Sequence, residues 1–298
     1  MEIVEYGGWD NNIRLTNGEI EVIITKDIGP RVIRFGFVGG ENVFAEIPDQ
    51  MGGSGELEWM IRGGHRFWVA PEENPKTYEP DNKPVEAEEV PGGVMVAQQK
   101  GHLSGIQKTL KVTLASKANA VRVIHTMVNM NDEPIIAAPW GLSVMAPGGL
   151  AIIPLPKKIS HDAQLTHNQE WSIWGYTDLQ DPRWGFGSKY VFLKQDPNLG
   201  PTKIGFRHSE GWASYLREGL LFIKHFEHVP SAKYPDGGSN LEVYAQEEFL
   251  ELESLGPLMN LGPKEGVKHE ERWVLHKDVP DCASEDEVDA HVKSLIKE

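Results

Sequence analysis

The chain has 298 residues, 40% of them hydrophobic and 24% charged, which is enough apolar material for a sizeable core and argues against wholesale disorder. The 29 Lys and Arg residues face 44 Asp and Glu, and the formal charge of −15 argues against nucleic acid or an anionic membrane as a partner. The N-terminus has no apolar run of signal length, and no stretch approaches the roughly 20 apolar residues of a membrane span, so we expect a cytoplasmic protein.

Segments with strand character recur along the chain, with β-branched and aromatic residues often alternating with polar ones and Gly, Pro, Asn or Asp at many joints. They cover residues 20–25, 31–38, 93–98, 106–114, 120–128, 190–193, 220–226, 241–245, 249–254 and 270–275. Residues 108–114, KTLKVTL, place a largely apolar set on one face, as half-buried antiparallel strands do. The pattern predicts an all-β fold, a large antiparallel β-sandwich in which residues 1–298 form a single domain.

The C-terminus is the exception to the strand pattern. Ser284 and Glu287 form an S-x-x-E capping box ahead of Val288, Val292 and further apolar residues at helical spacing. We therefore expect a closing amphipathic helix over about residues 284–297, with its apolar stripe covering an edge or face of a sheet.

Residues 60–72, MIRGGHRFWVAPE, combine hydrogen-bonding and aromatic side chains around two glycines. Arg62, His65 and Arg66 can donate hydrogen bonds, and Trp68 offers an apolar face. Sugars present both hydroxyl edges and C–H faces, so their pockets use both kinds of group. The alternative is a bend with outward arginines and a buried tryptophan.

Residues 77–84, TYEPDNKP, form a Pro-rich loop full of hydrogen-bonding groups. Tyr78, Asp81 and Asn82 either point into a cleft or satisfy their own turn, and the residues alone favour the turn.

Residues 249–257, FLELESLGP, contain the sharpest pattern. On a strand, Glu251 and Glu253 share one face, while Leu250 and Leu252 share the other. Two close carboxylates on a half-buried surface raise each other's pKa, which suits a general acid or base. The alternative is a solvated strand face, where most glutamates lie.

We expect no metal site. His225 and His228 are three residues apart in the sequence KHFEH. On a strand they point to opposite faces and cannot chelate one ion.

Three segments together resemble the galactose mutarotase-like superfamily and, within it, the bacterial proteins grouped as the DUF4380 family. Residues 62–64 look like the R-G-G of hexose-6-phosphate 1-epimerases. Residues 128–144, VNMNDEPIIAAPWGLSV, are similar to the "N-x-x-D-x-P … H-P-Y-F-x-L" stretch of mutarotases. Residues 249–257, with LGPKE at 261–265, resemble the late strand that carries the catalytic Glu. The resemblance implies a mutarotase-like supersandwich whose concave face binds a carbohydrate.

In this superfamily a Glu removes the anomeric hydroxyl proton while a His protonates the ring oxygen, so that the sugar ring opens and recloses. The resemblance places Glu253 at the position of the base. Ala138 stands where mutarotases have a functional His, so the acid must be another residue. His65 is our first choice because it follows the R-G-G motif, and His102 is the second.

The function that the resemblance implies is an aldose 1-epimerase-like activity on a free or acidic sugar, without a cofactor. The expected substrate-binding residues are Arg62, Arg66, Trp68, Tyr78, Asn82, His102, Trp140, Lys224 and Glu251. The alternatives are a noncatalytic carbohydrate-binding or regulatory protein and, ranked last, a glycoside hydrolase or lyase. The expected partner is a small-molecule carbohydrate, and the sequence leaves a homodimer open.

Overall fold

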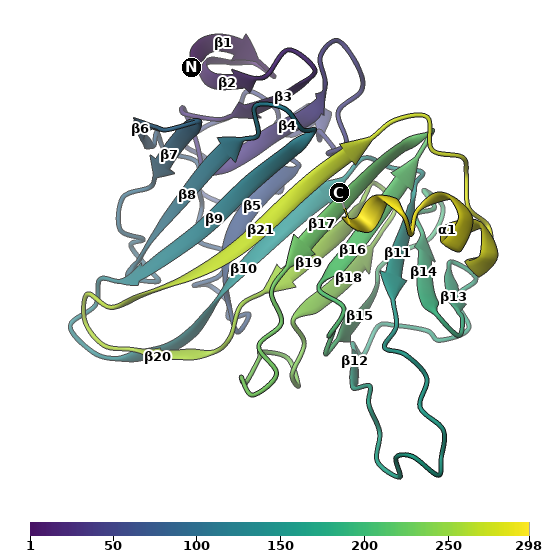
Figure 1. Ribbon diagram of the computed structural model, residues 1–298. Coiled ribbons are helices and arrows are strands. Elements are labelled where there is room, and N and C mark those ends of the chain that lie inside the picture. The colour runs from purple at the N-terminus through teal and green to yellow at the C-terminus, as the bar shows by residue number, and fades with distance from the viewer. Residues whose placement is uncertain (298) are drawn as a thin grey trace.

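The computed structural model describes residues 1–297 and contains two antiparallel β-sheets (Figure 1). The 11-stranded sheet contains, in spatial order, β1 (Glu2–Tyr6), β2 (Trp9–Thr16), β3 (Ile20–Ile24), β4 (Arg31–Phe37), β5 (Gly64–Ala70), β10 (Ile135–Met145), β19 (Leu250–Leu255), β18 (Leu241–Ala245), β15 (Thr202–Phe206) and β12 (Trp171–Ile173), with β20 (Met259–Leu261) paired to β10. The 10-stranded sheet contains β13 (Trp184–Phe186), β14 (Tyr190–Lys194), β11 (Leu150–Pro154), β16 (Trp212–Arg217), β17 (Leu220–Phe226), β21 (Gly266–His276), β9 (Ala120–Asn129), β8 (Ile106–Leu114), β7 (Gly93–Ala97) and β6 (Glu86–Val90). The predicted all-β sandwich is confirmed.

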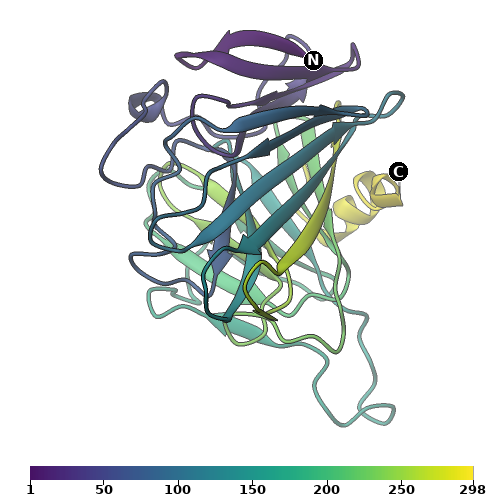
Figure 2. The same cartoon turned by 90° about the vertical axis from the view of Figure 1, so that its left-hand side faces the viewer.

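The main core fills the space between the two sheets. Its centre is a set of aromatic side chains from both layers, in which Phe44 and Trp273 pack edge to face with ring centroids 5.5 Å apart. Phe35 and Phe222 contact the same tryptophan. Buried aromatic residues contribute large apolar areas, so this cluster holds the two sheets together. Figure 2 shows the β1–β2 hairpin (purple) across one end of the sandwich.

The C-terminal segment packs on the outer face of the 10-stranded sheet (Figure 1). The helix α1 (Glu285–His291) begins as predicted, because Ser284 Oγ accepts a hydrogen bond from the Glu287 amide. The fully buried Val288 and Val292 contact outward residues of the sheet, such as Ile223. The α-helix ends at His291, before the predicted end, and a 3₁₀ turn follows at Leu295–Lys297. Across residues 1–297, no helix combines the length and apolarity that a membrane crossing needs.

Candidate functional site

A cavity of about 500 Å³ lies on the outer face of the 11-stranded sheet, over β5, β10, β19, β18 and β15. Strand periodicity builds it: Arg66 pairs with Leu142, and Leu142 with Glu253, so these side chains form one row across three strands. Eight aromatic residues wall the cavity: Trp59, Trp68, Tyr78, Trp140, Trp174, Tyr176, Tyr244 and Phe249. The cavity therefore combines aromatic surface with charged groups.

Glu253 is the most enclosed carboxylate lining this cavity, with 1% of its surface exposed. Its Oε2 accepts hydrogen bonds from Trp140 Nε1 at 2.9 Å and from Lys203 Nζ at 3.0 Å. Within residues 1–297, no hydrogen bond is made to Oε1, the other oxygen. Burial raises the pKa of Glu253, although the neighbouring Lys203 ammonium opposes the shift. One carboxylate oxygen thus stays available to a ligand.

Lys203 joins two carboxylates. Its Nζ lies 2.6 Å from Glu242 Oε2 and 3.0 Å from Glu253 Oε2, and it stands over the rings of Trp140 and Trp174. Burial alone would lower the pKa of Lys203, but the two glutamates outweigh burial and raise it. Burial also raises the pKa of Glu242 well above its usual range. The lysine is therefore a permanent cation beside carboxylates that hold protons more tightly than usual.

Arg66 and Glu251 form the second charged pair in the cavity. Arg66 Nη1 donates to Glu251 Oε1 at 2.5 Å. The guanidinium lies over the rings of Trp59 and Trp68, at 5.1 and 4.4 Å from their centroids. The face shared by Glu251 and Glu253 is thus a cavity wall in which each carboxylate has a cationic partner.

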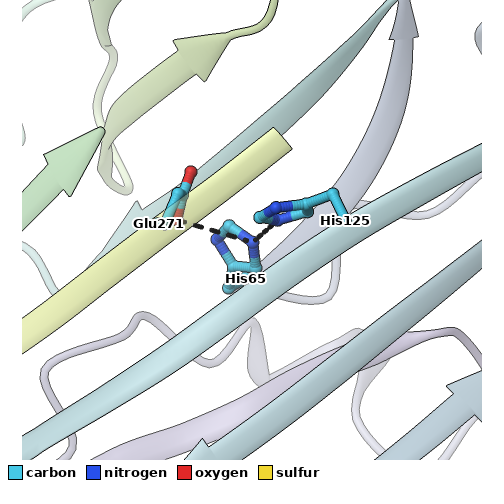
Figure 3. A group of neighbouring side chains, drawn as sticks. All are labelled: His65, His125 and Glu271. Carbon is cyan, nitrogen blue, oxygen red and sulfur yellow. Dashed lines mark hydrogen bonds and ion pairs between the residues drawn. The ribbon is translucent and has the colours of Figure 1, made fainter. Parts of the chain in front are cut away.

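His65 lies on the opposite face of β5, inside the sandwich, and does not line the cavity of Glu253. Its Nε2 is 2.7 Å from His125 Nε2 and 3.9 Å from Glu271 Oε2 (Figure 3). Successive residues of a strand point to opposite faces, so His65 and Arg66 cannot share one pocket. The structure does not bring the expected acid and base together.

The buried cluster around His65 is closely hydrogen-bonded. His65 Nδ1 contacts Ser143 Oγ at 2.9 Å, and His125 Nδ1 contacts the His269 carbonyl at 3.2 Å. Burial lowers the pKa of both His65 and His125. The ligand atoms of His65, His125 and Glu271 lie within 4.8 Å of one another, a span that a metal ion could bridge.

Glu271 already has a cationic partner in this cluster. Lys224 Nζ lies 3.1 Å from its Oε1 and also donates to the Leu252 carbonyl at 2.9 Å. A divalent ion here would add buried positive charge to a balanced pair, so the arrangement favours a closed hydrogen-bond network. Lys224, expected to bind substrate, is fully enclosed between the sheets.

Arg62 and Asn82 have structural partners outside the cavity. Arg62 Nη2 pairs with Glu56 Oε2 at 2.5 Å, and Asn82 Nδ2 donates to the Glu56 carbonyl at 2.5 Å. Gly63 approaches the Ala45 carbonyl so closely that a Cβ would clash with it. The R-G-G motif therefore forms the turn that leads into β5, and its glycines lie close to the backbone of neighbouring segments.

Tyr78 lines the cavity and donates its hydroxyl to Glu72, while Trp68 and Trp140 pack edge to face above the sheet. His102 lies elsewhere, in a separate pocket with Lys108. Of the predicted residues, the structure therefore brings together Glu253, Glu251, Arg66, Trp68, Tyr78 and Trp140.

No protein-family model matches the chain, so the resemblance to the DUF4380 family finds no support there, and no curated protein matches it. Solved structures do match. A galactose mutarotase-like protein from Lactobacillus casei ATCC 334 aligns with a TM-score of 0.61 and 10% identity, over 89% of this chain and 100% of that one. A galactose mutarotase related enzyme from Lactobacillus acidophilus aligns with a TM-score of 0.58 and 9% identity, over 92% and 100%. A protein from Synechocystis sp. PCC 6803 aligns with a TM-score of 0.60 and 11% identity, over 93% and 100%.

The chain has the galactose mutarotase-like fold. Within this fold, Ala138 is a fully buried residue of β10 that packs with Trp68 and Trp140 beside the cavity. A methyl group thus occupies the position where the resemblance expects a functional His.

Sequence reasoning missed several residues that line this cavity, among them Trp59, Trp174 and Lys203. Lys203 is in the strand sequence TKIGF, where a single lysine among apolar neighbours was the available signal. Trp174 lies in a stretch rich in aromatic residues, between Trp171 and Trp184, and its side chain lines the cavity.

Proposed function

We propose that this protein binds a carbohydrate in the cavity over β5, β10, β19, β18 and β15. The main support for this proposal is Glu253. Its Oε1 can still accept a hydrogen bond, and it lies in a cavity walled by aromatic residues. A sugar hydroxyl can donate to this oxygen, while sugar C–H faces pack against indole or phenol rings. The cavity volume of about 500 Å³ falls within the usual range for small-molecule sites.

The charges of the cavity favour an uncharged free sugar over an acidic one. Both cations that line it, Arg66 and Lys203, are paired with carboxylates. A phosphate or uronate would have to compete with Glu251 or Glu253 for these cations, at a cost in binding free energy.

Aldose 1-epimerisation is the second candidate function, and the raised pKa of Glu253 favours it because a base works best with a pKa near the operating pH. Glu253 would accept the anomeric hydroxyl proton as the bond between C1 and the ring oxygen breaks. None of the described residues that line the cavity is a histidine, so another donor would have to protonate the ring oxygen. The mutarotase-like names of the structural neighbours support this candidate.

Binding and exchange can be measured separately. Saturation-transfer NMR with D-galactose, D-glucose and other free aldoses should detect binding, and saturation transfer between anomers should detect epimerisation. We expect Glu253→Gln to weaken binding about tenfold or more, since a charge-assisted hydrogen bond contributes about 1.5–3 kcal/mol. Glu88→Gln, an exposed change on β6, is the control. Binding without accelerated exchange selects the noncatalytic function, and no binding by any aldose refutes the proposal.

A further inference from the structure

A second cavity, of about 100 Å³, has the opposite charge character to the protein as a whole. Its lining includes Lys76, Lys83, Lys100 and Lys108, against the two carboxylates of Glu79 and Asp81. It shares no lining residue with the aromatic cavity. In a chain with a formal charge of −15, this is a local concentration of positive charge.

Lys108 is the buried cation of this cavity. It extends from β8, is 8% exposed, and its Nζ donates one hydrogen bond, to the Phe67 carbonyl at 3.0 Å. No carboxylate oxygen of residues 1–297 lies within 4.0 Å of its Nζ. Burying an ammonium without a counter-ion is costly, and two of its three N–H groups have no acceptor among residues 1–297.

Both acidic residues of the cavity are committed to other partners. Asp81 Oδ2 accepts from Arg31 Nη2 at 2.9 Å. Glu79 accepts from the amides of Leu103 and Ser104 at 2.8 and 3.2 Å and so fixes the turn that carries His102. Neither carboxylate lies close enough to Lys108 to pair with it directly.

We propose that this cavity is an oxyanion site that binds phosphate or the phosphate group of a small ester, with Lys108 as its buried cation. Lys76 pairs with Glu73 at 3.0 Å and Asp81 pairs with Arg31, so Lys83, Lys100 and Lys108 stand against Glu79 and leave two positive charges, which a phosphate dianion neutralises. Lysine binds phosphate as a point charge and needs no fixed bidentate geometry. The narrow volume restricts the occupant to a small group.

The organic part of an ester has a place beside this site. A cavity of about 500 Å³ shares Val69, Lys76, Thr77 and Ser104 with the lysine cavity. Its remaining wall has apolar residues such as Ile106 and Ile135, together with the carboxylates of Glu73, Asp132 and Glu133. An ester with an apolar body should therefore bind more tightly than inorganic phosphate. This site is independent of the proposed carbohydrate cavity.

Thermal unfolding and calorimetry with sodium phosphate and phenyl phosphate test the site in the full chain. The wild type should show a higher Tm in about 10 mM phosphate than in sodium chloride of equal ionic strength, because a ligand that binds only the folded state stabilises it. Lys108→Met should abolish this rise and, in phosphate-free buffer, should be at least as stable as the wild type, since it removes an unpaired buried charge. Lys158→Met, an exposed change, should respond as the wild type does.

The exposed Lys83 provides a second variant that cannot disturb the core. Lys83→Met should weaken phosphate binding several-fold. The site is refuted if the wild type shows no phosphate-specific rise in Tm, or if both Lys108→Met and Lys83→Met bind phosphate as the wild type does.

Discussion

His65 and Arg66 are adjacent in the sequence, yet their side chains lie on opposite faces of β5. The imidazole contacts His125 between the two sheets, and the guanidinium pairs with Glu251 in the outer cavity. Strand geometry thus divides the residues around the R-G-G motif between a structural cluster and a candidate binding site.

This division predicts different effects for the two side chains. His65→Leu removes the partner of Ser143 and His125 and should lower the free energy of unfolding by about 1–3 kcal/mol, the cost of leaving buried polar groups unsatisfied. It should change carbohydrate affinity less than about twofold, because the contacts that it removes lie inside the sandwich. Denaturant unfolding and calorimetry measure the two quantities, and a folded His65→Leu protein that has lost its carbohydrate affinity would contradict the assignment.

Lys203→Met should be strongly destabilising. It leaves Glu242 and Glu253 buried without their shared cation, and breaking a buried pair in this way costs about 3–5 kcal/mol. The loss should shrink at pH 5, where the two carboxylates are more readily protonated. Adding Glu242→Gln to Lys203→Met should recover part of the stability, and urea unfolding of the single and double variants checks this. Equal stability of the two would count against the shared pair.

Sequence periodicity predicted much of the fold because half-buried strands alternate apolar and polar residues. All ten predicted segments coincide with strands, from residues 20–25 in β3 to 270–275 in β21. The other strands were not predicted, and among them is β10, whose pattern Pro139 and Gly141 interrupt. Gly141 has a tertiary reason: a Cβ there would meet Glu271 and His125. Such an approach involves residues far apart in the chain and leaves no local signal.

The sequence predicted those parts of the candidate site in which the residues share one face of a single strand. The spacing of the E-x-E motif correctly placed Glu251 and Glu253 on one face of their strand. Arg66 and Trp68 are also two residues apart, and they likewise line the cavity together. The cation that pairs with Glu253 was not predictable. Lys203 lies 50 positions away, and its role depends on β15 and β19 both pairing with β18.

Gly63→Ala should reveal how much the R-G-G turn depends on glycine. Gly63 has φ +98° and lies against the Ala45 carbonyl, so alanine there brings both backbone strain and a clash. Gly55 has φ +76° with open space around it, so Gly55→Ala isolates the strain, about 1–2 kcal/mol. In denaturant unfolding, Gly63→Ala should lower the free energy of unfolding clearly more than Gly55→Ala does. Equal losses would show that the contact between residue 63 and the Ala45 carbonyl does not affect stability.

Stability should fall as the pH drops below about 6.5, because several histidines are buried in neutral form. Burial lowers the pKa of His269 to about 3 and that of His208 to about 4, whereas the unfolded chain binds these protons near pH 6.5. The unfolded state therefore binds more protons between these values, and each such histidine removes up to about 1.4 kcal/mol per pH unit as the pH falls.

Urea unfolding at pH 7.5, 6 and 5 measures the slope. His269→Gln should reduce it, while His161→Gln, an exposed change, should leave it unaltered. A free energy of unfolding that stays constant from pH 7.5 to 5 would mean that the buried imidazoles do not control acid stability.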